Sequence, residues 1–363
     1  MIKSFRFSLA WLLLLLCSGM NAQTSAPKYS NEFLNVGVGA RALGMSNSVI
    51  ASVNDVTAGY WNPAGLNGIT TQFSIDLMHS EYFAGIAKYD YAGFAKRIDS
   101  ASVFGFSMIR FGVDNIPNTT DLVDGNGNFN YDKITTFSAA DYAFLLSYAR
   151  LAKIKGLRYG GSVKIIRRIV GDFAGAWGFG FDLGAQYEVK KWRFGLMMRD
   201  VTSTFNAWTF NLNDQMKQTF LATGNTLPTN SVEVTLPRML LGATRKYEFL
   251  NNRFSLAPEL GVDVTFDGRR NVLLKSSVAS ADPHFGFEAG YKNMIFLRGG
   301  IGNIQTETDI TGTKFTSFMP NIGVGVKFKA FTLDYALTDI GDQSVAEYSN
   351  VFSLKIDLNR KTP

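Results

Sequence analysis

Cysteine and histidine are nearly absent from this sequence of 363 residues. The chain has one cysteine, Cys17, and two histidines, His79 and His284. An internal disulfide needs two cysteines, and a structural zinc site needs several Cys or His ligands. The sequence therefore excludes a disulfide framework, and we expect no metal site and no cofactor.

Charged residues are also scarce. Charged residues make up 18% of the chain, whereas a soluble domain has about 25%. The formal net charge is +6, without the concentrated basic stripe of a nucleic-acid-binding protein. Hydrophobic residues reach 46% and aromatic residues 13%, which excludes a disordered chain. We expect no nucleic acid as a partner.

Long apolar runs are missing except at the N-terminus. Lys3 and Arg6 precede an apolar run over 7–16, and small residues follow up to Ala22. This order is typical of a secretory signal peptide, so we predict one over 1–22. After it, no window has the 18 apolar residues that a transmembrane helix requires.

Apolar and polar residues instead alternate with period two along much of the chain. Between Trp177 and Val189 the odd positions are apolar or aromatic, and the even positions are glycine or polar. The same alternation recurs over 254–266, 322–328 and 352–358. Strict alternation predicts strands with one apolar face.

Marked in this way, the chain contains fourteen strands, mostly of the length that a tilted membrane strand needs. The predicted strands are 72–79, 86–98, 101–112, 137–150, 157–170, 177–189, 192–203, 237–248, 253–266, 283–291, 294–303, 318–328, 331–341 and 346–358.

Long and short connections alternate between these strands. The four long loops are 113–136, 204–236, 267–282 and 304–317, and all four would lie at the same end of a sheet of these strands. Outer-membrane barrels have long extracellular loops and short periplasmic turns. We therefore predict an all-β fold: a closed, 14-stranded antiparallel transmembrane β-barrel over 72–358. Lipid and lipopolysaccharide would surround it, both termini would be periplasmic, and 359–363 would form a tail.

The segment 23–71 precedes the barrel and is rich in small residues. Gly37, Gly39 and Gly44 permit close backbone contacts, as a hatch folded inside a lumen needs. We expect Arg41 to find an acidic lumen partner. The candidates are Asp182, Glu259, Asp263 and Glu288.

Three runs carry a resemblance to a known family: G-A-R-A-L-G-M at 39–45, W-N-P-A-G-L at 61–66, and I-T-T-F-S-A-A-D-Y-A-F-L-L-S-Y-A-R at 134–150. They resemble the PorV/PorQ family of Bacteroidota outer-membrane proteins, which is similar to the FadL group of long-chain fatty acid transporters. The resemblance implies a 14-stranded barrel with an N-terminal hatch. The hatch elements that it transfers are Gly39, Arg41, Gly44, Asn62, Pro63 and Ala64.

The same resemblance implies a component of the type IX secretion system, and some relatives are associated with gliding motility. Its partners would be the C-terminal signal domains of secreted cargo, the translocon and the attachment subunits. Apolar residues of the 204–236 loop would anchor such a partner in one interpretation; in the other, the loop packs on itself over the barrel mouth. These residues are Phe205, Trp208, Phe210, Phe220 and Leu221.

The alternative function is FadL-like transport of hydrophobic small molecules. It predicts an apolar pocket in the lumen and a lateral opening where a strand bends. Pro258 is the expected position of a bulge or a bend, because proline removes a ladder donor.

Catalytic and lipid-binding sites are not predicted. Neither histidine belongs to a recognisable catalytic motif, so we expect no enzyme. Asp121, Asp124, Asn126 and Asn128 recur in a loop as in calcium sites, but the loop lacks the sixth-position glycine and a closing Glu, so we predict an ordinary surface loop. Lys and Arg gather at the short turns, which we interpret as solvated turns rather than as a lipid headgroup site.

Overall fold

A computed structural model describes residues 30–122, 128–308, 311–340 and 348–359. The predicted signal peptide, the first residues of the hatch segment and most of the C-terminal tail lie outside these ranges. Within them, no helix is long and apolar enough to cross a membrane.

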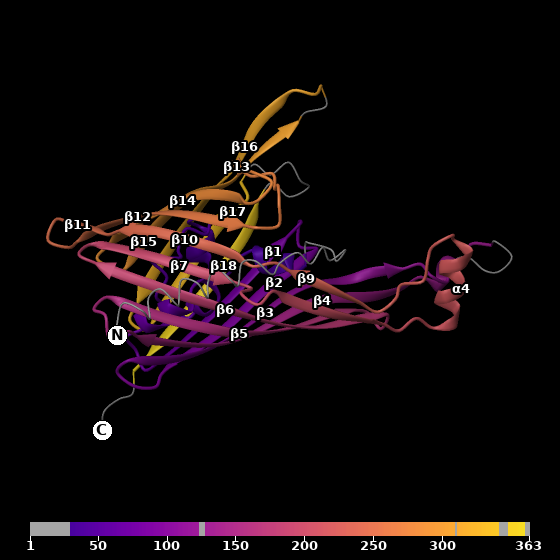
Figure 1. Cartoon of the computed structure of the whole chain (residues 1–363), viewed down its shortest axis with the longest axis horizontal. Coiled ribbons are helices and arrows are strands. Elements are labelled where there is room, and N and C mark those ends of the chain that lie inside the picture. Colours follow the sequence, from indigo (N-terminus) through magenta and orange to yellow (C-terminus); the bar gives the residue numbers. More distant parts are fainter. Residues whose placement is uncertain (1–29, 123–127, 309–310, 341–347, 360–363) are drawn as a thin grey trace, which may run out of the picture.

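One antiparallel sheet closes on itself to form a barrel (Figure 1). Its first strand, β1 (Phe73–Tyr82), pairs with β2 (Ala87–Arg97) on one side and with the last strand, β18 (Ser349–Leu358), on the other. Closure gives each strand of the barrel wall a paired neighbour on both sides, as hydrocarbon surroundings require. The predicted fold class, a closed 14-stranded antiparallel barrel, is therefore confirmed.

The fourteen strands are built from more than fourteen segments. One strand consists of β7 (Trp192–Arg199) and β8 (Thr204–Phe210), and the next of β9 (Ser231–Thr235), β10 (Arg238–Arg245) and β11 (Tyr247–Phe249). The other strands are β3 (Ser102–Asn118), β4 (Thr135–Leu151), β5 (Leu157–Val170), β6 (Ala174–Val189), β12 (Phe254–Thr265), β14 (Ser280–Tyr291), β15 (Ile295–Thr308), β16 (Lys314–Phe328) and β17 (Phe331–Thr338). The short β13 (Leu274–Lys275) pairs only with β14, inside a long loop.

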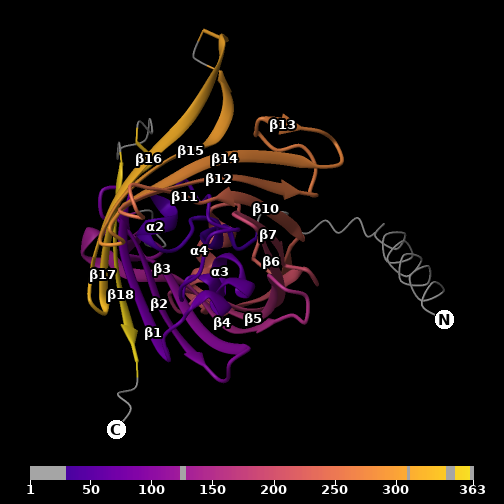
Figure 2. The same cartoon turned by 90° about the vertical axis from the view of Figure 1, so that its left-hand side faces the viewer.

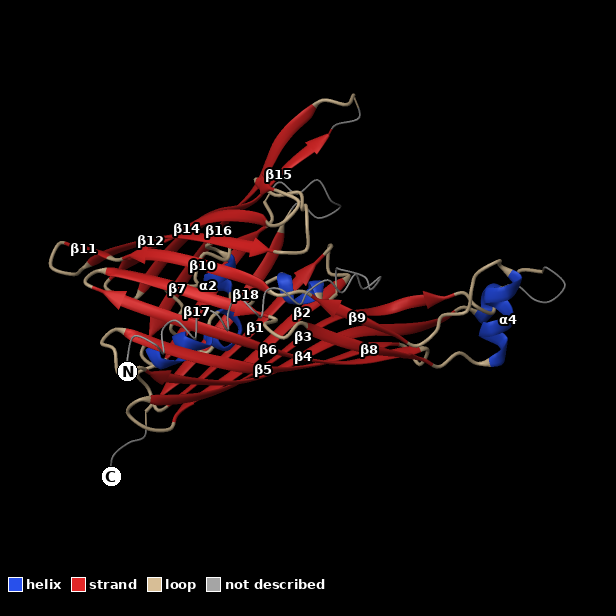
Figure 3. Cartoon of the chain, viewed as in Figure 1, coloured by secondary structure: helices blue, strands red, loops and turns tan. Residues whose placement is uncertain are grey.

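Several strands extend further toward the long loops than alternation predicted. The strand β3 ends at Asn118 instead of 112, and about a third of the predicted 204–236 loop is strand β8 or β9. Beyond the apolar band of the barrel that faces lipid, side chains need not alternate between apolar and polar. The alternation therefore did not reveal these strand ends. The extended strands carry the helix α4 (Asp214–Ala222) at the far end of the molecule (Figures 1 and 3).

The expected bulge at Pro258 was wrong. Pro258 pairs in continuous register with Phe287, and on its other side the neighbouring strand is already interrupted between β10 and β11. A missing N–H at this gap costs little. The wall instead breaks between β7 and β8, where Asp200 and Ser203 adopt φ of 56° and 57°.

The hatch fills part of the lumen (Figure 2). It consists of η1 (Glu32–Asn35), α2 (Ala40–Leu43), α3 (Ala58–Trp61) and η2 (Pro63–Gly68). Its apolar side chains form one core with inward residues of the wall, including Tyr89, Ile109, Leu145 and Ile166. Part of the lumen is therefore filled by apolar side chains, although the alternation of apolar and polar residues in the strands predicts a polar lumen face.

This core explains the sequence of 101–112, in which apolar residues stand at both odd and even positions. Val103 and Ile109 are fully buried against the hatch side, whereas Phe104 and Phe106 are each 37% exposed on the outer face. Both faces of β3 are apolar because one meets lipid and the other meets the hatch.

Candidate functional site

The Asn62–Pro63 turn fastens the hatch to the wall. The Nδ2 of Asn62 donates to the carbonyl oxygens of Ile50 in the hatch and Ala185 in β6, both at 3.1 Å. Its Oδ1 accepts from the backbone N–H of Ala64 at 3.3 Å, which caps η2. Asn62 and Ala64 are fully buried, so this turn is a structural contact in the lumen.

Glycines bring the hatch close to the wall. Gly37 and Gly39 have φ of 95° and 88°, a region that other residues rarely adopt. Gly44 lies so close to Gly323 of β16 that a Cβ on Gly44 would be 3.1 Å from the Gly323 Cα. The small residues of the hatch thus permit backbone to pass against backbone.

Arg41 joins a chain of buried charges. Its Nε lies 2.9 Å from Oε2 of Glu288, one of its four expected partners. Glu288 Oε2 also lies 2.7 Å from Arg298 Nε, and Arg298 Nη1 lies 2.7 Å from Asp334 Oδ1. Burial opposes the charge on Arg41, but the Glu288 carboxylate outweighs it and holds the pKa of Arg41 above its ordinary value. The chain ties α2 to β14, β15 and β17.

The other candidate partners are engaged elsewhere. Glu259 Oε1 accepts the backbone N–H of Ala51 at 2.7 Å. Asp182 lies 3.2 Å from Lys164, which also contacts Asp200 at 2.5 Å. This second cluster lies where the wall breaks between β7 and β8, and it supplies the polar contacts that the interrupted ladder lacks.

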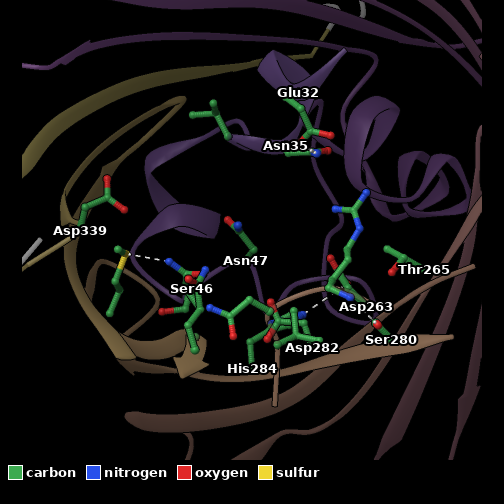
Figure 4. A pocket seen from close by; sticks show the side chains of 18 of the residues that line it. Glu32, Asn35, Ser46, Asn47, Asp263, Thr265, Ser280, Asp282, His284 and Asp339 are labelled. Carbon is green, nitrogen blue, oxygen red and sulfur yellow. Dashed lines mark hydrogen bonds and ion pairs between the residues drawn. The ribbon is translucent and has the colours of Figure 1, made fainter. Parts of the chain in front are cut away.

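The hatch separates two cavities in the lumen. The turn-side cavity, of about 440 Å³, is lined by charged residues such as Arg41, Asp76 and Lys355. The loop-side lumen cavity, of about 660 Å³, is lined mainly by polar residues such as Asn47 and Asp282 (Figure 4). Neither is the apolar lumen pocket that the transport alternative predicted.

A serine, a histidine and an aspartate lie in series beside the loop-side lumen cavity. His284 Nδ1 is 2.8 Å from Ser48 Oγ, and His284 Nε2 is 3.4 Å from Asp263 Oδ1. Ser48 is fully buried, so its hydroxyl has no access to a substrate. A nucleophile needs such access, so we interpret the trio as a contact that fixes the hatch.

An apolar cavity of about 360 Å³ lies at the loop end, between α4 and the ends of β3, β4, β5, β6 and β8. We call it the loop-side apolar cavity. Its apolar wall includes Phe137, Phe173, Phe210, Met216 and Phe220. Phe137 and Phe173 meet edge to face with ring centroids 4.7 Å apart.

Contacts of the backbone and of one threonine hold α4 over this cavity. The N–H of Asn211 donates to the carbonyl of Phe173 at 2.7 Å, and Thr219 Oγ1 donates to the carbonyl of Thr120 at 3.3 Å. Asn213 caps the helix by accepting the Met216 N–H at 2.8 Å.

The structure divides the five apolar residues predicted as a partner-binding loop. Phe210 and Phe220 line the loop-side apolar cavity. Trp208 lies on β8, facing the guanidinium of Arg168 at 5.0 Å. Phe205 is 46% exposed on β8 and Leu221 is 62% exposed on α4. The five therefore form no single surface, because three of them belong to a strand whose side chains alternate.

Sequence reasoning missed Phe137 and Phe173. Each stands at the loop end of a strand, where an aromatic residue was interpreted as part of a strand or of a short connection. Of the loop residues considered for calcium, 123–127 lie outside the described part of the chain. Among the described residues, no group of three or more His, Cys, Asp or Glu is placed to hold a metal ion.

No protein-family model matches the chain, and no curated protein sequence does. Among solved structures, the toluene transporter TbuX of Ralstonia pickettii superposes with a TM-score of 0.51 at 14% identity, over 89% of this chain and 99% of that chain. A FadL homologue of Pseudomonas aeruginosa gives 0.52 at 12% identity, over 88% and 98%. The monoaromatic hydrocarbon channel CymD gives 0.53 at 11% identity, over 90% and 98%.

These neighbours are described as a toluene transporter, a FadL homologue and a monoaromatic hydrocarbon channel. At such low identity the likeness concerns the fold, and it lends no support to the PorV/PorQ assignment. The chain has the fold of the FadL-type outer-membrane β-barrels.

Proposed function

We propose that this barrel passes hydrophobic small molecules across the outer membrane, and that the loop-side apolar cavity is their first binding site. The observation that carries the proposal is this cavity of about 360 Å³, walled by aromatic rings and methionine at the loop end. Ligand pockets range from about 300 to 1,000 Å³ and are mostly apolar. The cavity therefore suits an aromatic ring or a short acyl chain.

The similar solved structures support this choice of substrate. Two of them are described as a toluene transporter and a monoaromatic hydrocarbon channel. Burial of an apolar ligand contributes about 25 cal/mol per Å² of apolar surface removed from water. Aromatic walls such as Phe137 and Phe220 supply that surface without a charged group.

The lumen sets a condition on transport. Both cavities beside the hatch are lined by charged and polar groups, and the hatch lies between them. A hydrocarbon that leaves the loop-side apolar cavity thus meets no continuous apolar path among the described residues. Transport consequently requires the hatch or the broken wall at 200–203 to shift.

Two neighbouring residues of α4 provide the test. Phe220 lines the cavity, whereas Leu221 is 62% exposed and does not. Phe220→Glu places a carboxylate in the apolar site, and Leu221→Glu adds the same charge outside it. Uptake of radiolabelled toluene would be measured in cells that carry each variant, with binding to purified protein in nanodiscs as the second measurement.

We expect Phe220→Glu to lower both toluene binding and uptake at least several-fold, and Leu221→Glu to leave both near the unmodified level. Equal uptake by cells with and without the barrel would contradict the transport function. Unchanged binding in Phe220→Glu would contradict the assignment of the site.

A role in type IX secretion remains a second candidate, supported by the resemblance to PorV/PorQ. Exposed Phe205 and Leu221 offer apolar contacts to a cargo domain or a translocon subunit. Affinity purification from the native outer membrane tests this role. Co-purification of a translocon or attachment subunit that Leu221→Glu abolishes would favour secretion, because the same variant should leave toluene uptake intact.

A further inference from the structure

The short-turn end of the barrel carries a ring of positive charge. The six short connections with their flanking residues contain fifteen Lys or Arg and three acidic residues. We call this set the basic rim; it comprises 96–102, 149–158, 187–193, 245–255, 290–295 and 326–331. Figure 2 shows the barrel from this end.

The opposite end has no such excess of positive charge. The described connections on the long-loop side contain six acidic residues and five basic ones. They comprise 83–86, 119–122, 128–134, 171–173, 211–230, 266–279, 311–313, 339–340 and 348. Polar turns in general would not concentrate positive charge at one end only, so simple solvation does not account for the rim.

The three acidic residues neutralise little of the rim. Glu188 lies 3.1 Å from Arg158 and 3.2 Å from Arg193, and Glu248 lies 2.9 Å from Lys246. Within the described part of the chain, nine exposed cations of the rim form no ion pair. They are Lys96, Arg150, Lys153, Lys155, Lys190, Lys191, Arg253, Lys292 and Lys329.

Backbone conformation shows that lysine is placed here against local preference. Lys190, Lys292 and Lys329 each occupy the first position of a tight turn with φ of 55°, 53° and 54°. This left-handed region favours glycine, asparagine and aspartate. Three of the six short turns thus place a lysine where glycine, asparagine or aspartate would be accommodated more easily.

Aromatic rings place these charges at a defined depth. The ammonium of Lys292 lies 5.2 Å from the ring centroid of Tyr291, and that of Lys329 lies 5.2 Å from Phe328. The guanidinium of Arg245 lies 5.6 Å from the Trp192 ring. Rings of this kind mark the boundary between hydrocarbon and headgroups, so the cations beside them lie at the level of lipid phosphates.

We infer that the basic rim binds the anionic phospholipid headgroups of the leaflet that surrounds the short turns. Basic clusters beside a membrane attract anionic lipids. All six short turns carry at least one cation, so the charge runs around the whole circumference. An annulus of lipid contacts a barrel in this way, whereas a docked acidic protein would contact one sector.

Two variants with equal change of charge test this inference. The rim variant is K153Q/K155Q/K292Q/K329Q, and the loop variant is K133Q/K217Q/K275Q/K314Q. All eight lysines are exposed, so both chains should fold, and circular dichroism with heat-dependent gel mobility would verify it. Each protein would be equilibrated with mixed phosphatidylglycerol and phosphatidylcholine, and the retained lipids would be counted by native mass spectrometry.

We expect the unmodified protein and the loop variant to retain phosphatidylglycerol several-fold over phosphatidylcholine. The rim variant should lose most of that preference, and added salt should weaken it in all three proteins. Equal retention of the two lipids by the unmodified protein would overturn the inference. So would an equal loss in the loop variant, or a rim that captures an acidic periplasmic protein while showing no lipid preference.

Discussion

Arg41 of the hatch and Glu288 of β14 are 247 residues apart in the sequence, and their side chains meet at 2.9 Å inside the barrel. The pair is largely buried, with 19% and 18% of the two side chains exposed. Glu288 also holds Arg298, so this one carboxylate connects the hatch to the wall.

Replacing Glu288 by glutamine should loosen the hatch, because it leaves Arg41 and Arg298 without their shared carboxylate. Loss of one partner of a buried ion pair costs about 3 kcal/mol or more. Hydrogen exchange of the amides of 40–68 should become faster, while exchange in the strands away from β14 stays slow. Lys246→Gln, which removes an exposed pair with Glu248, is the control and should change neither. Unchanged exchange in Glu288→Gln would mean that packing alone holds the hatch.

Adjacent glycines of β5 test how closely the hatch packs against the wall. A Cβ on Gly160 would lie 2.7 Å from the Pro63 carbonyl carbon and 2.8 Å from the Ala64 nitrogen. A Cβ on Gly161 would meet Leu183 Cδ2 at 3.2 Å.

Gly160→Ala should therefore displace the Pro63–Ala64 segment, at a cost of about 1–3 kcal/mol. Gly161→Ala should cost less, because its Cβ would meet a movable leucine methyl group and, at 3.3 Å, the carbonyl oxygen of Asp182, whereas the backbone contacts at Gly160 are shorter. Limited proteolysis of the hatch and the urea midpoint of the barrel would be compared in the two variants. Equal behaviour of both would refute the proposed close packing.

Alternation predicted the barrel because a wall with one apolar face leaves a period of two in any sequence. Over 157–170 the predicted strand and β5 have the same bounds. The extended ends of β3, β6 and β8 were missed because those residues lie beyond the apolar belt. In 101–112 both odd and even positions are apolar because the inner face meets the hatch, whose apolar side chains are far away in the sequence.

The contacts of the hatch were harder to predict than its existence. Small residues and the Asn62–Pro63 pair indicated a packed segment, but Arg41 had four candidate partners. Only the register of β14 with β15 brings Glu288 beside Arg298, and Glu288 in turn reaches Arg41 of α2. The loop-side apolar cavity could likewise not be predicted from the sequence, since Phe137, Phe173 and Phe220 come from three separate segments.

Lys164 should be essential to the broken part of the wall. Its side chain is 2% exposed and contacts Asp182 at 3.2 Å and Asp200 at 2.5 Å. Lys164→Met would leave two buried carboxylates without a cation, which should lower the free energy of unfolding by roughly 3–5 kcal/mol.

Neutralising the carboxylates as well should recover much of this loss. In K164M/D182N/D200N no buried charge of the cluster remains, so the urea midpoint in phospholipid vesicles should rise again relative to Lys164→Met. A triple variant no more stable than Lys164→Met would show that the lysine acts through packing and not through charge.

The loop after β12 should respond to acid through Asp267. Burial would raise the pKa of this carboxyl, but hydrogen bonds from Arg270, at 2.9 and 3.0 Å from its Nε, outweigh burial and hold the pKa below its ordinary value of 3.8. A depressed pKa stabilises the folded loop above the unfolded value, and the contribution is lost as the pH falls through the folded one.

The protection of the amides of residues 266–280, taken relative to their intrinsic exchange rate at each pH, should accordingly stay high from pH 7 to about pH 4, near the ordinary carboxyl pKa, and fall only in stronger acid. Arg270→Gln removes the hydrogen bonds, so the loop should exchange faster already at pH 7 and lose the acid-dependent step. Arg269→Gln removes an exposed charge next to it and is the matched control. If the two variants exchange alike, the acid response does not depend on the contact between Asp267 and Arg270.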